Sequence, residues 1–201
     1  MSAISLQGNA GGTGTLTVAA PSTNTNRTLT LPDGTGTFSV AGVNSNIVSG
    51  TAVASTSGTS IDFTGIPTWV KRITVMFNAV STSGTSITQI QIGAGSVTTS
   101  GYATSTTQFV DAGAVSVVTA SSGFTCLTSN AAGYNLIGNI QICNISSNTW
   151  VANGVLGMST TARSSYLAGF IALGGTLDRV RITTGNGTDT FDAGSINILY
   201  E

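Results

Sequence analysis

Lys71 is the only lysine and Glu201 the only glutamate in this chain of 201 residues. These strong helix formers, together with periodic stretches rich in Leu, are the usual material of amphipathic helices, so their scarcity leaves little from which to build one. Thr, Val and Ile are abundant instead, and these β-branched residues pack well on the pleated surface of a sheet. The sequence therefore predicts an all-β protein.

Apolar and polar residues alternate with a period of two in several short segments, as in strands that have one buried face. The clearest such segments are 73–77, 89–92, 140–142, 179–183 and 196–200. About eight short strands joined by Gly-rich turns favour a β-sandwich, and among sandwiches a jelly roll. The hydrophobic share of 40% supplies enough apolar surface to offset the entropy lost when the chain is ordered.

The first forty or so residues differ from the rest, and the composition shifts again after them. Two short alternations of Thr with apolar residues, Thr15–Val18 and Thr28–Leu31, are each followed by a turn signal that contains Pro. A segment of this length buries too little surface to fold alone, so other copies are expected to cover it. We therefore expect an intertwined β segment for attachment and trimerisation over 1–40, a linker over 41–60 and the sandwich over 61–201. The side chains expected at the contacts between copies are Leu16, Val18, Leu29 and Leu31.

Charge and hydropathy narrow the range of partners. Six basic and seven acidic residues give a net charge of -1, and the basic residues are scattered, so we expect no nucleic-acid partner. No apolar run approaches the length that crosses a bilayer, and the first residues lack the basic start and apolar stretch of a signal peptide. We therefore expect no membrane insertion and no export by the general secretory route.

Cys126 and Cys143 are the two cysteines. They could form one disulfide, but two cysteines in a chain of this size do not make a disulfide framework. Buried free thiols are the favoured interpretation.

The chain has no histidine, which removes the usual general base and the commonest metal ligand. Catalysis would depend on carboxylates, and Asp189 with Asp192, and with Asp178 further back, could hydrolyse a glycoside as paired acids. Asp189 and Asp192 lie in turn-like sequence, where Asp is common because its side chain bonds nearby backbone. The run Gly185–Asp189 lacks the acidic spacing of a calcium loop. We therefore expect no enzyme activity, no cofactor and no metal.

Aromatic residues in polar surroundings are candidate contacts for a glycan. Trp150 lies in an Asn-rich stretch, with Arg163 and Tyr166 further along, and Tyr102 and Tyr134 could join them. An exposed aromatic ring beside Arg and amides suits stacking on sugar rings and bonding of their hydroxyls. The alternative for these residues is packing at a subunit interface, where Trp, Tyr and Arg are also enriched.

Trp69 precedes the strand predicted at 73–77, and an aromatic ring there is expected to pack in the core. Lys71 and Arg72 follow it. They could bind an anionic glycan, but a solvated strand start, or a pair with an Asp of another subunit, is favoured.

The stretch from Gly11 to Phe38, which contains TLTVAAP and RTLTLPDGTGT, resembles the opening segment of many tailed-phage and prophage fibre proteins. The stretches 61–86 and 191–201 are similar to a pattern found in phage virion proteins. The resemblance implies a homotrimeric protein of the virion surface, made in the host cytoplasm. Its N-terminal segment would bind other virion proteins, of the tail or the capsid, and its C-terminal knob would adhere to host-surface carbohydrate.

Dedicated tail fibres often begin with a longer anchoring domain than the forty or so residues available here. A head fibre or a capsid decoration protein with the same trimeric fold is therefore the main alternative. A glycan depolymerase and a cellular adhesin are more remote alternatives.

Overall fold

The computed structural model of the chain describes residues 47–110 and 113–201, together with Gly11 and Asn24. The chain divides into two units, 1–39 and 40–201, and the fold given below is that of the second unit. Almost all of the expected attachment segment lies outside the described residues, and so do its four predicted contact residues, Leu16, Val18, Leu29 and Leu31.

The described residues form strands and contain no α-helix, which confirms the predicted all-β class. The strands are β1 (Val48–Ser49), β2 (Val53–Ala54), β3 (Ser60–Thr64), β4 (Arg72–Thr82), β5 (Thr88–Ala94), β6 (Ser96–Val97), β7 (Ala103–Phe109), β8 (Val115–Ala120), β9 (Phe124–Thr125), β10 (Leu136–Ser146), β11 (Thr149–Met158), β12 (Arg163–Ala172), β13 (Arg179–Thr184) and β14 (Phe191–Tyr200). All five segments that the alternation predicts as strands lie within strands, in β4, β5, β10, β13 and β14.

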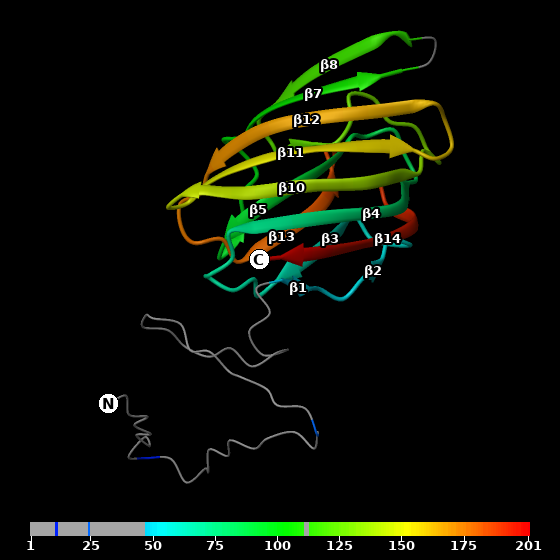
Figure 1. Cartoon of the computed structure of the whole chain (residues 1–201). Helices are drawn as coiled ribbons and strands as arrows, with labels where there is room; N and C mark the ends of the chain where they lie inside the picture. The colour runs from blue at the N-terminus through cyan, green and yellow to red at the C-terminus, as the bar shows by residue number, and fades with distance from the viewer. Residues whose placement is uncertain (1–10, 12–23, 25–46, 111–112) are drawn as a thin grey trace. The chain divides into compact units, whose positions relative to one another are not determined.

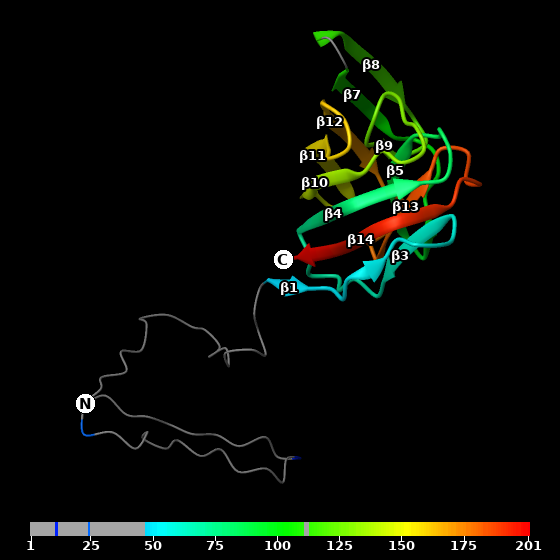
Figure 2. The same ribbon diagram turned by 90° about the vertical axis from the view of Figure 1, so that its right-hand side faces the viewer.

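The strands make two antiparallel sheets. The nine-stranded sheet runs in the order β1-β14-β4-β10-β11-β12-β7-β8, with β2 also paired to β14, and the five-stranded sheet runs β3-β13-β5-β6, with β9 paired to β5. The five-stranded sheet lies against one face of the nine-stranded sheet, as the two views in Figure 1 and Figure 2 show. This arrangement is a β-sandwich, as predicted.

The core lies between the sheets because alternation directs every second side chain inward. Ile73 and Val75 of β4 and Ile140 of β10 are fully buried on the nine-stranded sheet, and Ile90 of β5 and Ile182 of β13 are fully buried on the five-stranded sheet. The opposite faces of the two sheets point away from this core. They carry the candidate binding surfaces.

Part of the expected linker belongs to the sandwich. Within 41–60, β1 pairs Val48 with Tyr200 and β2 pairs Val53 with Ile196, both on β14. Ser55 is fully buried, and its hydroxyl donates to the carbonyl of Ala193 at 2.7 Å. The composition suggested a connector because these residues are small, but the edge of β14 offers them backbone partners.

The two cysteines are free thiols in different surroundings. Cys126 is fully buried, and burial raises the pKa of its thiol to about 12. Cys143 is half-buried on β10. Burial, the expected state of both thiols, is therefore complete only for Cys126.

Cys126 is expected to resist alkylation by iodoacetamide in the folded protein, because only the thiolate reacts and burial disfavours it. The same thiol should react after unfolding in guanidinium chloride. Mass spectrometry of the peptide that contains Cys126, before and after denaturation, measures the difference. Equal rates of modification in the two states would contradict the burial of this side chain.

Candidate binding surfaces

Most of the nine-stranded sheet comes from a stretch of sequence that is almost free of charge. Between Arg72 and Arg163 the only charged residue is Asp111, and strands β7, β8, β10 and β11 contain none. A solvated sheet face commonly carries Lys, Arg, Asp or Glu, which keep it soluble and block association. Strands β7, β8, β10 and β11 therefore lack the charged side chains that a solvated sheet face commonly carries.

The register of the strands brings apolar side chains together on the outer face of this sheet. Tyr166 of β12 lies beside Val155 of β11 on one side and Thr107 of β7 on the other, and Phe109 makes an edge-to-face contact with Tyr166 at 5.7 Å between ring centroids. The exposed large apolar residues of these strands that face outward are Phe109, Val115, Val117, Ile137, Val155, Tyr166 and Phe170. We call this set the apolar face.

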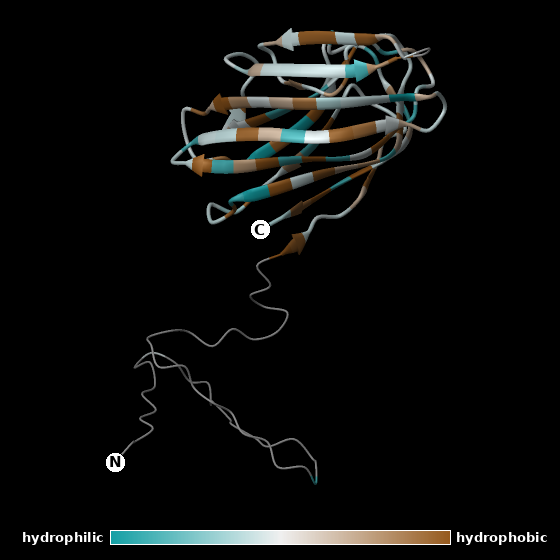
Figure 3. Cartoon of the chain, turned by 45° about the horizontal axis from the view of Figure 1, so that its top comes forward, coloured by the Kyte–Doolittle hydropathy of each residue, from teal (hydrophilic) through white to brown (hydrophobic). Residues whose placement is uncertain are grey.

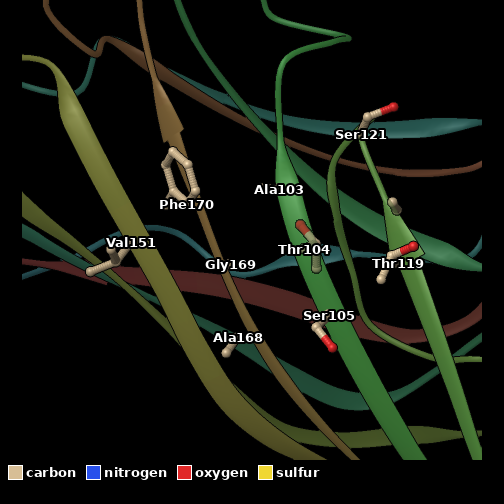
Figure 4. Close-up of a pocket in the computed structure, with 10 residues that line it drawn as sticks. Ala103, Thr104, Ser105, Thr119, Ser121, Val151, Ala168, Gly169 and Phe170 are labelled. Carbon is tan, nitrogen blue, oxygen red and sulfur yellow. The ribbon is translucent and has the colours of Figure 1, made fainter.

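A groove lies within the apolar face because neighbouring strands carry small side chains there. Ala168 of β12 is paired with Ser105 of β7, and Ala103 is paired with Phe170. The groove has a volume of about 680 Å³. Figure 4 shows Phe170 and Val151 on one side of it and Ser105 in the middle. The groove could receive a side chain of a partner protein.

The apolar face has the composition of a protein interface. Cores of interfaces are poor in charge and rich in aromatic residues, and contiguous exposed apolar patches on a soluble chain mark interaction sites. The hydropathy colouring in Figure 3 shows strands of this sheet with hydrophobic and neutral residues along much of their length. β8 is the last strand at this end of the sheet, and a strand in that position leaves backbone groups without a neighbouring strand.

The outer face of the five-stranded sheet is polar instead. Gln89 and Gln91 alternate with the buried Ile90 and Ile92 along β5. A cleft of about 380 Å³ lies over this face. The residues that line the cleft are Thr59, Ser60, Gln89, Gln91, Thr99, Ser122, Arg181, Thr183, Thr184, Gly185, Asn186 and Gly187. We call it the polar cleft; the sequence did not lead us to predict it.

The aromatic residues predicted to contact a glycan do not form one surface. The structure places Trp150, at 4% exposure, and Tyr102 in the core. The Tyr102 hydroxyl accepts a hydrogen bond from the backbone N–H of Ile92 at 2.8 Å, and burial raises the pKa of this tyrosine to about 12. Neither ring is available to stack on a sugar at the surface of this chain. Trp150 lies among polar residues in the sequence, but its register position beside Ile171 turns it inward.

The remaining predicted contacts divide into two places. The guanidinium of Arg163 lies over the ring of Tyr134, at 5.1 Å from its centroid, and donates to the hydroxyl of Ser129 at 3.3 Å. Tyr166 belongs to the apolar face, where it contacts Phe109. Arg163 and Tyr134 therefore stabilise each other by a cation–π contact.

The prediction that Trp69 packs in the core is wrong. Its side chain is 49% exposed and lies against the ring of Tyr200, with 6.0 Å between the centroids. Arg72 forms an ion pair with Glu201, and Lys71 donates to the side-chain oxygen of Asn144 at 3.5 Å. The ion pair of Arg72 therefore lies within one chain and involves Glu201, whereas the predicted pair was with an Asp of another subunit.

Each candidate catalytic carboxylate has a hydrogen-bond partner in the fold. Asp189 accepts from the side chain of Asn186 at 2.7 Å and from the backbone N–H of Ser86 at 2.8 Å, and these bonds lower its pKa. Asp178 accepts two hydrogen bonds from Arg179, at 2.7 and 3.0 Å, which lower its pKa. Asp192 accepts from the hydroxyl of Ser81. These partners account for the position of all three carboxylates.

Among the residues that the structure describes, no three His, Cys, Asp or Glu side chains gather as metal ligands. No helix in the same ranges is long and apolar enough to cross a membrane. Comparison with protein-family models, with curated proteins and with solved structures found no match to the chain. Its function is therefore argued from its own residues.

Proposed function

We propose that the chain is a non-enzymatic structural protein of a bacteriophage virion, a homotrimeric fibre or knob that contributes to adhesion to the host surface. The observation that carries the proposal is the apolar face. A protein that acts as one chain in solution gains nothing from seven exposed apolar side chains on strands that are almost free of charge. A protein built to assemble needs such a face. The resemblance of the stretch 11–38 to phage fibre segments supplies the kind of assembly and its three-fold number.

The apolar face is large enough to form part of a stable contact between copies. The strands β10, β11, β12, β7 and β8 are neighbours. At about 4.8 Å between strands, and about seven residues of 3.3 Å along each, they cover roughly 550 Å² before side-chain relief is counted. A stable interface takes roughly 800 Å² from each partner. In a three-fold arrangement each chain offers different parts of its surface to its two neighbours, so each contact would also use surface outside the apolar face.

The distribution of strands supports the jelly-roll part of the proposal. Along the chain β3, β5, β9 and β13 belong to the five-stranded sheet, whereas β4, β7, β8, β10 to β12 and β14 belong to the other. In a jelly roll successive strands alternate between two sheets and one hairpin stays within a sheet. The strands from β3 to β9 follow this pattern apart from the short β6, whereas β10, β11 and β12 follow one another within the nine-stranded sheet. The hairpin of β7 and β8 takes that position here.

A head fibre or capsid decoration protein is the alternative within the same proposal, because it would share the fold and the trimer. The apolar face is compatible with both positions on the particle. The depolymerase interpretation has no structural observation in its favour, since the three carboxylates that it would use hold turns and strand ends.

The test is to image particles of the phage or prophage that encodes the chain, after binding of a gold-labelled antibody. Label at the tail tip or the fibres is expected for an adhesive fibre, and label over the head would make the protein a decoration or head fibre. Particles without label would contradict the virion proposal. Light scattering of the purified chain tests the trimer separately, with an expected mass of three times 20.1 kDa.

A further inference from the structure

Two buried glutamine amides at the floor of the polar cleft have unused hydrogen-bonding capacity. Gln89 is 3% exposed and Gln91 is 5% exposed. The side-chain oxygen of Gln89 accepts from the hydroxyl of Ser122 at 2.9 Å, and the side-chain nitrogen of Gln91 donates to the carbonyl of Ser122 at 2.8 Å. The Nε2 of Gln89 and the Oε1 of Gln91 have no partner in the described part of the chain.

An unused donor and an unused acceptor that open onto a cleft can both bond a ligand that enters it. Both residues line the polar cleft. Neither free atom is among the buried polar atoms that lack a partner in the described residues, so both atoms are open to the cleft. One amide offers an N–H and the other offers a carbonyl oxygen, which is the pair of contacts that a hydroxyl group can satisfy.

The cleft carries no net charge. Arg181, its only charged lining residue, donates two hydrogen bonds to Asp62, from Nε at 2.6 Å and from Nη2 at 2.9 Å. This bidentate pair raises the pKa of Arg181 and neutralises its charge with the carboxylate next to it. An anionic ligand would need a cation without such a partner. The polar cleft therefore favours a neutral ligand.

The wall of the cleft is held in place before any ligand arrives. Asn186 accepts hydrogen bonds from the backbone N–H of Thr188 at 3.0 Å and from that of Asp189 at 3.1 Å. Its own N–H donates to the hydroxyl of Ser86 at 2.9 Å. A turn closed by three such bonds loses little conformational freedom on binding, and preorganisation of this kind raises affinity.

We propose that the polar cleft binds a neutral carbohydrate, with Gln89 and Gln91 contacting its hydroxyl groups at the floor. The assignment as a host-surface glycan rests on the proposed adhesive function, whereas the site itself rests on the contacts above. The cleft and the apolar face lie on opposite sides of the sandwich, so assembly through the apolar face leaves the cleft open. Each trimer would present three equal weak sites, which many copies convert into tight adhesion.

The test uses nuclear magnetic resonance of the folded protein with ¹⁵N-labelled glutamine side chains. Neutral hexoses, 6-deoxyhexoses and N-acetylhexosamines are titrated one at a time to about 50 mM, a range that detects dissociation constants near the millimolar scale. The side-chain amide signals of Gln89 and Gln91 are expected to shift with at least one of these sugars. Gln141, which lies on the opposite face of the sandwich, is expected to stay unchanged.

Gln89→Glu is the matched variant, because it keeps an oxygen that can accept from Ser122 and replaces the free N–H with a carboxylate oxygen, which also adds a negative charge. It is expected to weaken sugar binding about tenfold or more. Thr64→Glu adds the same charge at an exposed position of β3 that lies outside the cleft lining and outside the apolar face, and it should leave binding unaltered.

No shift with any neutral sugar would overturn the proposal, and so would binding of sialic or glucuronic acid alone, or shifts at Gln141 in place of Gln89. None of these outcomes bears on the mass of the trimer or on the labelling of particles. A trimer that binds no sugar would therefore remove the carbohydrate site and leave the virion proposal standing. A chain that binds sugar but is missing from particles would remove the virion proposal and leave the carbohydrate site standing.

Discussion

Replacing Val155 with aspartate is expected to reduce the mass of the protein in solution from that of a trimer to that of a single chain. Val155 is 48% exposed and lies in register between Tyr166 of β12 and Asn139 of β10, near the middle of the apolar face. In a free chain the new carboxylate would be solvated. In the assembly it would be buried without a partner, which costs about 3 to 5 kcal/mol and weakens association by a factor on the order of 10² to 10⁴.

Thr64→Asp is the matched control for this substitution. It adds the same charge at an exposed position of β3, on the five-stranded sheet. Light scattering measures the mass, and circular dichroism shows that each variant retains its sheet structure. A trimer that survives Val155→Asp, or one that Thr64→Asp dissociates equally well, would contradict the assignment of the apolar face as the contact between copies.

Phe124→Ala is expected to lower the free energy of unfolding by about 3 to 5 kcal/mol, because it removes a large ring and leaves a cavity. Phe124 is fully buried and meets the ring of Tyr102 edge to face, with 5.0 Å between the centroids. It pairs with Ile90 of the five-stranded sheet. A Cβ built on Gly169 of the other sheet would lie 3.0 Å from its ring. The ring therefore joins the two layers.

The loss is large beside a total stability of about 5 to 15 kcal/mol. It should be measured by urea unfolding in the Val155→Asp background, since the stability of a trimer depends on its concentration. Phe170→Ala is the control, because that ring is 52% exposed and its loss from a single chain is expected to cost less than about 1 kcal/mol. Equal losses for the two variants would contradict the burial assigned to Phe124.

The strands could be predicted from the sequence because their signal is local. Ile73, Val75 and Phe77 alternate with less buried residues, and each turns toward the core as the pattern predicts. Pairing is not local. The residues of β1 and β2 resemble a linker in composition and become strands only because β14, far along the chain, gives them an edge.

Burial of the aromatic residues could not be read from neighbouring residue types. Trp150 stands among Asn and Ser but occupies an inward register position, whereas Trp69 stands beside Pro and Val and remains half exposed. The polar cleft was missed for a related reason. The alternation of Gln89 and Gln91 with Ile90 and Ile92 predicts that the amides face outward, but Ser122, which covers them, comes from a distant loop.

The place of β14 in the nine-stranded sheet has a consequence for the order in which the chain folds during synthesis. β14 pairs with β4 along much of its length, and Asn78 and Ser195, which face each other there, are 117 residues apart. Until that last strand leaves the ribosome, β4 has one unpaired edge and part of its buried face is uncovered. Contacts between such distant residues slow folding and prolong the lifetime of aggregation-prone intermediates. The yield of folded protein should therefore depend on chaperones that shield β4 during this interval.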